Sequence, residues 1–513
     1  MKRSSGDLLF PRDVKYWGMD TPPGRKQSGF ALLVFSISLA IFMSSLDGTI
    51  VNIALPTISS SFDISTTTVS WVATVYLIVM AGCVLVFGKI SDLIGFKKIF
   101  LAGFSIFTAG SLMCGVLPDL LGSFDLLIVS RVVQGVGGAM MTAIAPAMVT
   151  EYIPLSQKGR AMGIVMTMAA LGMAVGPTIG GLLTEYLSWH WIFFINVPVG
   201  IAAVLLGHRA VPRDTRTGSL AGFDYPGAVL LFVGLAAIIF ALSDGLSLGW
   251  TSPPIVGAII VGMVSLAGLA LHEIRREDPL LEFGLFRERN FLTANIGLAL
   301  LFFSFGGVNY LLPFYLEYVQ GFSSSEAGLI LTVLSFAMMV AGLVAGALFN
   351  REGGRPLSIV AAGVIILGYF MLTGLRADSG LGYIFATLFC IGFGLGLLVT
   401  PLSNMILNAV QKKYQGVVSS LTSVERFAPM PLGIAVFNLA LLQGVQAVAR
   451  HRGVIESSPA SIKIEVLSAG FDLAFLAALV VAVIILLVTL VTRLEIHPDY
   501  RESDDGEIVL GMA

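Results

Sequence analysis

Long apolar runs separated by short polar segments dominate this chain. Runs of about 20 residues, the length that an α-helix needs to cross the hydrocarbon core of a bilayer, recur along nearly the whole sequence. Fourteen such runs lie near residues 30–53, 69–90, 99–117, 124–148, 161–184, 191–207, 224–243, 254–272, 292–314, 326–349, 357–375, 381–403, 416–442 and 470–492. The pattern predicts an all-α membrane protein with fourteen transmembrane helices.

The composition agrees with a bilayer protein and excludes a soluble protein of this size. Of the 513 residues, 56% are hydrophobic and only 12% are charged, and the mean hydropathy is +0.89. The net charge is −2 and the basic residues are scattered over loops, which gives no footprint for nucleic acid. Cys83, Cys114 and Cys390 fall within spans and lack metal-ligand spacing. We therefore expect no metal site, no cofactor and no nucleic-acid partner.

The distribution of basic residues predicts the orientation of the chain. Most of the 30 Lys and Arg residues fall in tails and loops on the same side as the N-terminus, and basic residues are retained on the cytoplasmic side. The polar residues 1–29 precede a span that is too long for a signal peptide. We expect a multi-pass protein with an uncleaved first helix and with both termini in the cytoplasm.

Asp47 is a lone carboxylate within the first apolar run. An ionisable group at bilayer depth is costly, so it normally faces a cavity or a partner and handles ions or substrate. Apolar surroundings penalise the charged form of a carboxylate, and Asp47 could therefore bind and release a proton. The alternative is a carboxylate that is permanently paired with a basic residue for packing.

Arg131 is a second charge inside a span, the fourth. Its guanidinium stays protonated and requires a carboxylate, a group of carbonyls or water. Asp47 is its expected direct or water-linked partner. A structural role, in which Arg131 binds carbonyls of the first helix, is the alternative.

The loop after the second span is repeated after the tenth. Gly88, Asp92, Gly95 and Lys97 correspond, at a constant offset of 258 residues, to Gly346, Asn350, Gly353 and Arg355. Glycine permits tight turns, which we expect at Gly88 and Gly95. Asp92 is expected against a helix N-terminus, where the helix dipole favours negative charge, and a simple capped turn is the alternative.

The repeat divides the chain into two six-helix halves and leaves two spans over as an inserted pair. Long cytoplasmic connections flank that pair. The expected organisation is a cytoplasmic tail (1–29), an N-terminal half (30–207), an inserted helix pair with its linkers (208–290), a C-terminal half (291–492) and a cytoplasmic tail (493–513).

The fifth span carries glycines at four-residue spacing. Gly172, Gly176 and Gly180 share one face, Gly181 follows, and Pro177 interrupts the run. Small residues at this spacing let another backbone approach closely, and proline kinks a helix. We expect a bent, tightly packed interface.

Four motifs in order resemble the fourteen-helix drug:proton antiporter branch of the major facilitator superfamily. They read Leu46-Asp47-x-Thr49-x-x-Asn52-x-Ala54-Leu55-Pro56, Gly88 to Lys98, Arg131-Val132-Val133-Gln134-Gly135-Val136-Gly137-Gly138, and Gly172-x-x-x-Gly176-Pro177-x-x-Gly180-Gly181. The resemblance covers most of the chain. It implies the major facilitator fold (6 + 2 inserted + 6 helices), a substrate site between the halves, and a place in the cytoplasmic membrane of a prokaryote.

The resemblance also implies residue roles. Asp47 and Arg131 would couple transport to protons, and the fifth-span glycines with Pro177 would form the antiporter motif, with generic helix packing as the alternative. Gly88, Asp92, Gly95 and Lys97 would gate the cytoplasmic side, with Asp92 against the start of the thirteenth helix near Gly416. The substrate-binding candidates are Asn52, Gln134, Asn309, Glu425 and Arg426. Glu425 and Arg426 point about 100° apart on their helix, so each needs its own partner or a wet cavity, and Glu425 is a candidate for recognising cations.

The expected function is proton-coupled export of small amphipathic compounds, drugs or toxic metabolites, by alternating access. Such a multidrug efflux protein would confer antibiotic resistance, would work as a monomer in the lipid bilayer, and would have protons and a small-molecule substrate as partners. The alternatives are a dedicated metabolite, lipid or siderophore exporter of the same fold, or a non-transporting membrane sensor. The sequence shows no nucleophile–base pair and no phosphate-binding loop, so neither an enzyme nor an ATP-driven pump is expected.

Overall fold

The computed structural model describes residues 23–214, 224–274, 283–411, 415–452 and 460–492, and every regular element in these ranges is helical. The helices of the first half and the inserted pair are α1 (Pro23–Phe62), α2 (Thr66–Ile94), α3 (Phe96–Leu121), α4 (Phe124–Tyr152), α5 (Leu155–Tyr186), α6 (Trp191–Phe194), α7 (Asn196–Ala210), α8 (Tyr225–Leu248) and α9 (Pro253–Glu273). Those of the second half are α10 (Arg289–Phe314), α11 (Ser324–Glu352), α12 (Gly354–Thr373), α13 (Leu381–Asn408), α14 (Gln415–Phe427), α15 (Pro429–Arg452) and α16 (Ala460–Val491).

Within the described residues, fourteen helical stretches are long and apolar enough to cross a membrane, as the sequence predicts. Two of them are broken. The sixth combines α6 and α7, and the thirteenth combines the end of α14 with α15 across a break at Ala428, where Pro429 cannot donate a backbone hydrogen bond. Several helices also extend beyond the apolar runs, because the polar residues that follow such a run continue the backbone hydrogen bonding of the helix. The connection between α15 and α16 is accordingly shorter than predicted.

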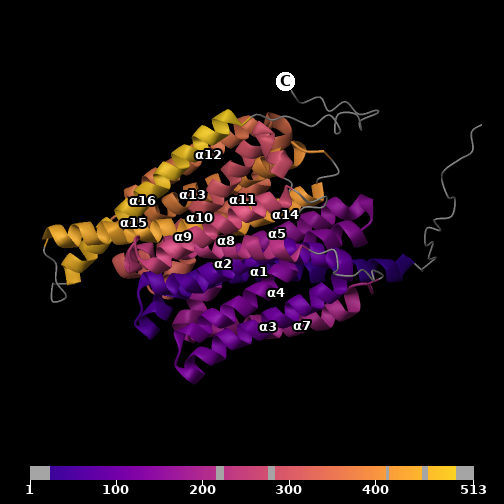
Figure 1. Ribbon diagram of the computed structural model, residues 1–513, viewed down its shortest axis with the longest axis horizontal. Coiled ribbons are helices and arrows are strands. Elements are labelled where there is room, and N and C mark those ends of the chain that lie inside the picture. Colours follow the sequence, from indigo (N-terminus) through magenta and orange to yellow (C-terminus); the bar gives the residue numbers. More distant parts are fainter. Residues whose placement is uncertain (1–22, 215–223, 275–282, 412–414, 453–459, 493–513) are drawn as a thin grey trace, which may run out of the picture.

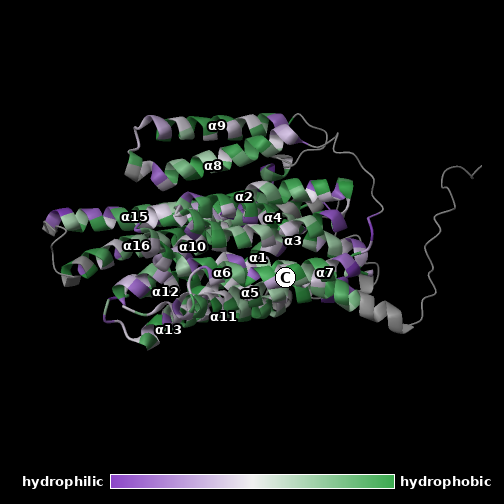
Figure 2. Ribbon diagram, turned by 90° about the horizontal axis from the view of Figure 1, so that it is seen from below, coloured by the Kyte–Doolittle hydropathy of each residue, from purple (hydrophilic) through white to green (hydrophobic). Residues whose placement is uncertain are grey.

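The helices form two bundles that meet along two seams (Figure 1). In the first half α1 packs against α5 and α3 against α4, while in the second half α13 packs against both α11 and α12. One seam joins α5 to α11, and the other joins α2 to α14 and α15. The inserted helices α8 and α9 pack against each other at the edge of the bundle, where α8 contacts α2 and α15 (Figure 2).

The sequence repeat is a structural repeat as well. Gly95 separates α2 from α3 at φ +106°, and Gly353 separates α11 from α12 at φ +79°. Both conformations are readily adopted by glycine and disfavoured for other residues. Lys97 Nζ donates to the carbonyls of His208 (2.7 Å) and Val211 (2.8 Å) at the end of α7. Arg355 Nη2 donates to a carbonyl near the end of α16, so each half uses its copy of the loop to hold its own last helix.

Gly88 differs from its predicted role. The helix α2 remains regular through Gly88 and continues to Ile94, so the turn is formed at Gly95 alone. Open space surrounds Gly88, whereas a Cβ at Gly95 would collide with the carboxylate of Asp214. The tight turn predicted at Gly88 is therefore wrong, because helical hydrogen bonds extend past it.

The glycine face of α5 brings two backbones close to it, as predicted. A Cβ at Gly172 would lie 2.6 Å from the carbonyl oxygen of Phe42, and one at Gly180 would lie 2.7 Å from that of Ile50. Gly181 instead faces the backbone of Ser324 in α11. One face of α5 thus fixes α1, and another forms the seam with the second half.

Candidate functional site

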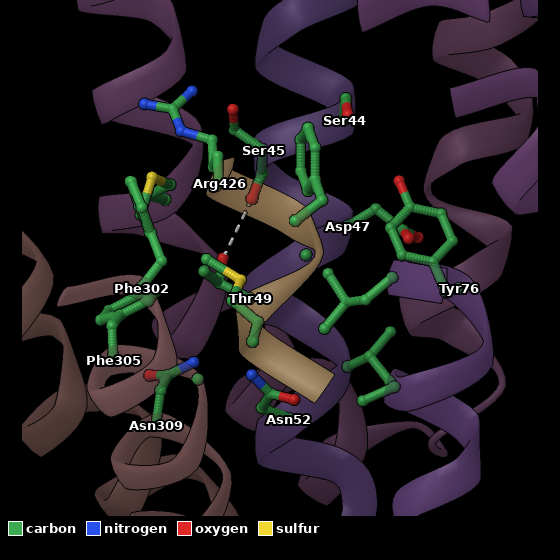
Figure 3. A pocket seen from close by; sticks show the side chains of 18 of the residues that line it. Ser44, Ser45, Asp47, Thr49, Asn52, Tyr76, Phe302, Phe305, Asn309 and Arg426 are labelled. Atoms are coloured by element: carbon green, nitrogen blue, oxygen red, sulfur yellow. Dashed lines mark hydrogen bonds between the residues drawn. The ribbon is translucent and has the colours of Figure 1, made fainter. Parts of the chain in front are cut away.

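A cavity lies between the two halves, with about 860 Å³ of empty space that includes open solvent at its mouth. Residues of α1, α2, α4 and α5 form one part of its wall, and residues of α10, α14 and α15 form the other. Figure 3 shows Phe302, Phe305, Asn309 and Arg426 on one side, and Asp47 and Tyr76 on the other.

Asp47 and Arg131 form a buried ion pair at the wall of this cavity. Arg131 Nη1 lies 2.8 Å from Asp47 Oδ2, and the side chains of Arg131 and Asp47 are 1% and 0% exposed, respectively. The direct partnership expected from the sequence is therefore present. Helix packing makes it possible, because the glycine face of α5 holds α1 close and α4 contacts α1 beside Asp47.

An amide shell surrounds the carboxylate of Asp47. Gln134 Nε2 donates to Asp47 Oδ1 (2.8 Å) and to Ser111 Oγ (2.8 Å), and Asn196 Nδ2 donates to the same carboxylate oxygen at 3.3 Å. Gln134 Oε1 accepts from Arg131 Nη1 (2.6 Å). Asp47 is thus held by hydrogen bonds from three side chains, those of Arg131, Gln134 and Asn196.

The guanidinium of Arg131 is held on its other sides by α2 and by an aromatic ring. Arg131 Nε donates to the carbonyl of Val72 (2.9 Å), and its central carbon lies 4.2 Å from the centre of the Tyr76 ring. Cation–π contact stabilises a desolvated guanidinium. Loss of one partner of a buried pair is costly because it leaves the other charge uncompensated.

The structure separates the predicted substrate-binding residues into two groups. Asn52, Asn309 and Arg426 line the cavity. Gln134 is fully buried and binds Asp47 and Arg131 instead. Glu425 is 9% exposed and is not among the described residues that line the cavity. Its Oε2 atom has no hydrogen-bond partner within the described ranges.

Glu425 and Arg426 differ in position because they are neighbours on one helix. Their directions differ by about 100° around the axis. The guanidinium carbon of Arg426 lies 5.6 Å from the centre of the Phe302 ring in α10. The cavity is thus lined by the arginine rather than by the carboxylate that the sequence suggested for recognising cations.

The expected gating residues occupy the end of α2 and the start of α3. Asp92 is exposed near the end of α2, and α2 packs against α14. Residues 412–414, which precede α14, lie outside the described residues, so the contact between Asp92 and the start of that helix stays a prediction.

A carboxylate that sequence reasoning did not single out caps α3. Asp214 accepts hydrogen bonds from the backbone N–H groups of Lys97 (3.0 Å) and Lys98 (3.1 Å). Negative charge is favoured at a helix N-terminus. Asp214 follows α7, and only the fold brings it to α3.

Asn196 and the aromatic wall were also missed. Asn196 is a polar residue inside the sixth apolar run, and this signal could have identified it. Tyr76, Phe302 and Phe305 had no comparable signal, because aromatic residues are common in lipid-facing and core positions alike.

Comparison with known proteins gives a family and several relatives. The model of the Major Facilitator Superfamily matches residues 37–433. The chain is 33% identical over 424 residues to the riboflavin transporter RibZ of Clostridioides difficile (strain 630), covering 82% of this chain and 90% of that protein. It is 32% identical to the puromycin resistance protein pur8 of Streptomyces alboniger (86% of each chain). It is 30% identical to the multidrug transporter protein MdtP of Bacillus subtilis (strain 168), covering 81% of this chain and 76% of that protein.

A solved structure supports the fold. The inward-facing, unoccupied structure of a bacterial homologue of the human lysosomal transporter Spinster matches with a TM-score of 0.63 at 17% identity. The match covers 92% of this chain and 98% of that one. The predicted major facilitator fold with fourteen membrane-spanning helices is confirmed for the described residues.

Proposed function

Because the chain belongs to the Major Facilitator Superfamily and is a multi-pass membrane transporter, we propose that it couples proton entry to the export of small amphipathic compounds. The observation that carries the proposal is the buried Asp47–Arg131 pair on the wall of the cavity between the halves. A carboxylate at that place can exchange its arginine partner for a proton while substrate occupies the same cavity.

The proposed cycle begins with Asp47 ionised and paired. A proton that binds the carboxylate removes its charge and weakens its attraction to Arg131, whose hydrogen bonds to Val72 and Gln134 remain. The halves then rock and the substrate leaves. Return of the proton to the cytoplasm restores the pair, and the pH gradient thereby drives export.

The contacts between the halves support alternating access. At the end of the bundle opposite the N-terminal tail, Tyr318 Oη donates to the carbonyl of Pro56 (3.1 Å), and the hydroxyls of Thr57 and Ser324 lie 3.4 Å apart. In the proposed orientation, with both termini cytoplasmic, these contacts close the external end. The cavity is built by helices of one chain, which supports the monomer as the transporting unit.

The test uses purified protein in liposomes with an imposed pH gradient and a panel of amphipathic dyes. Wild-type protein is expected to accumulate dye against its gradient and to move protons with it. Asp47→Asn should abolish accumulation while still allowing downhill exchange. Asp125→Asn, an exposed carboxylate in the first turn of α4, is the matched control. Uphill transport by Asp47→Asn would refute the coupling role.

A dedicated metabolite exporter is the second candidate. The similarity to the riboflavin transporter RibZ favours it, because that protein is named for one planar metabolite. Competition within the dye panel separates the two: mutual competition by unrelated compounds supports multidrug export, whereas transport of a single scaffold supports a dedicated exporter.

A further inference from the structure

We infer that Arg426 is the substrate-recognising cation of this cavity, and that the transporter selects aromatic compounds carrying an anionic group. The inference rests on the proposed function and names the substrate class of the same cavity.

The charges that line the cavity do not cancel. Asp47 and Arg131 neutralise each other at 2.8 Å. Among the described residues of the lining, Arg426 is the third charged one, and it adds a positive charge. While the Asp47–Arg131 pair is intact, the described residues of the wall therefore carry a net charge of +1 toward an entering ligand.

Arg426 lacks a counter-charge in the described part of the chain, where no carboxylate lies within ion-pairing distance of it. Its described interaction is the contact with the Phe302 ring. A guanidinium removed from bulk water requires compensation, and its planar fork of donors matches a carboxylate or a similar oxyanion. A ligand anion would supply that compensation, whereas a ligand cation would be repelled.

The remaining wall fits an aromatic body. Phe302 and Phe305 from α10 lie on the side of Arg426, and Tyr76 from α2 lies across the cavity (Figure 3). Asn52 and Asn309 add neutral amide groups to the lining. Aromatic rings stack or pack edge-to-face with such walls, so a ring system with an acidic oxygen group at one end complements the cavity in both shape and charge.

The charge preference is opposite to the one that Glu425 suggested. Glu425 is buried and is not among the described residues that line the cavity, so its carboxylate is not part of the described wall. Among the described residues of the lining, the only carboxylate is therefore that of Asp47, which is already paired with Arg131.

The test compares three xanthene dyes that share a ring system and differ in charge. Fluorescein is anionic, its methyl ether methyl ester is neutral, and rhodamine 123 is cationic. Fluorescence anisotropy would measure their binding to full-length protein in phosphatidylcholine nanodiscs, with empty nanodiscs as the blank and without a pH gradient. The variants are Arg426→Gln, Arg426→Lys and, as a matched loss of one positive charge, Arg450→Gln, which is exposed near the end of α15.

We expect wild-type protein to bind fluorescein at least about tenfold more tightly than rhodamine 123, as a charge-assisted hydrogen bond predicts. Arg426→Gln should weaken fluorescein binding about tenfold or more and change the affinity for the neutral ester less than about twofold. Arg426→Lys should keep most of the preference, and Arg450→Gln should keep all of it. The variants' unfolding temperatures would show that they fold.

The inference is overturned if wild-type protein fails to bind fluorescein, if it binds rhodamine 123 equally well, or if Arg426→Gln weakens all three dyes alike. Because binding is measured without a gradient, a failure of proton coupling leaves these results unaffected. Conversely, gradient-driven export without an anion preference would overturn this inference and leave the proposed function intact.

Discussion

The carboxylate of Glu185, at the end of α5, accepts the backbone N–H of Ser325 in the first turn of α11 at 2.8 Å. The contact crosses the seam between the two halves. It places a negative charge at a helix N-terminus, where the dipole favours it. We expect it to help hold this end of the bundle closed.

Glu185→Gln should therefore shift the protein toward a form that is open at this end. Spin labels on exposed positions of the two halves, Ser61 and Asp378, would report a longer-distance population by pulsed electron resonance. Glu326→Gln is the matched control, because Glu326 binds the N–H of Ser323 within its own half. An unchanged distance distribution would show that Glu185 contributes nothing to closure.

The Asp47–Arg131 pair makes a prediction about stability. Arg131→Gln leaves a buried carboxylate without its cation and should lower the free energy of unfolding by about 3–5 kcal/mol. The double variant Asp47→Asn with Arg131→Gln removes both charges and should recover most of that loss. Denaturant unfolding in mixed micelles would measure the cycle. Strictly additive single effects would mean that the two residues do not stabilise each other.

The two glycines Gly88 and Gly95 of the repeated motif should respond differently to alanine. Gly95→Ala places a Cβ at φ +106° and against the carboxylate of Asp214, so it should cost about 1–3 kcal/mol of unfolding free energy. Gly88→Ala sits in a regular helix with open space around it and should be neutral or slightly stabilising. Equal effects at the two positions would contradict this account of the turn.

The proposed orientation predicts opposite labelling of two exposed positions. In a background with Cys83, Cys114 and Cys390 replaced by serine, a cysteine at Glu288 should react with a membrane-impermeant thiol reagent only from the cytoplasmic side. A cysteine at Asp378 should react only from outside, because the two positions lie at opposite ends of the spans. Reaction of both from the same side would refute the orientation.

The sequence by itself determined the fourteen spans, the repeated loop and the presence of an isolated carboxylate, Asp47, in the first span. Hydropathy and spacing are local properties, and an isolated carboxylate in an apolar run is visible without a structure. The same is true of the glycine face of α5, since four-residue spacing puts small residues on one side of any helix.

The tertiary structure decided which groups meet. Asp47 and Arg131 are 84 positions apart, and their contact depends on how α1 and α4 are rotated and shifted against each other. The packing of α4 against α1 also brings Gln134 to Asp47. The orientation of α14 places Arg426 rather than Glu425 in the lining of the cavity, and the packing of α7 against α3 brings Asp214 to the start of α3. Helix orientation is set by packing over many residues at once, and no single segment of the sequence encodes it.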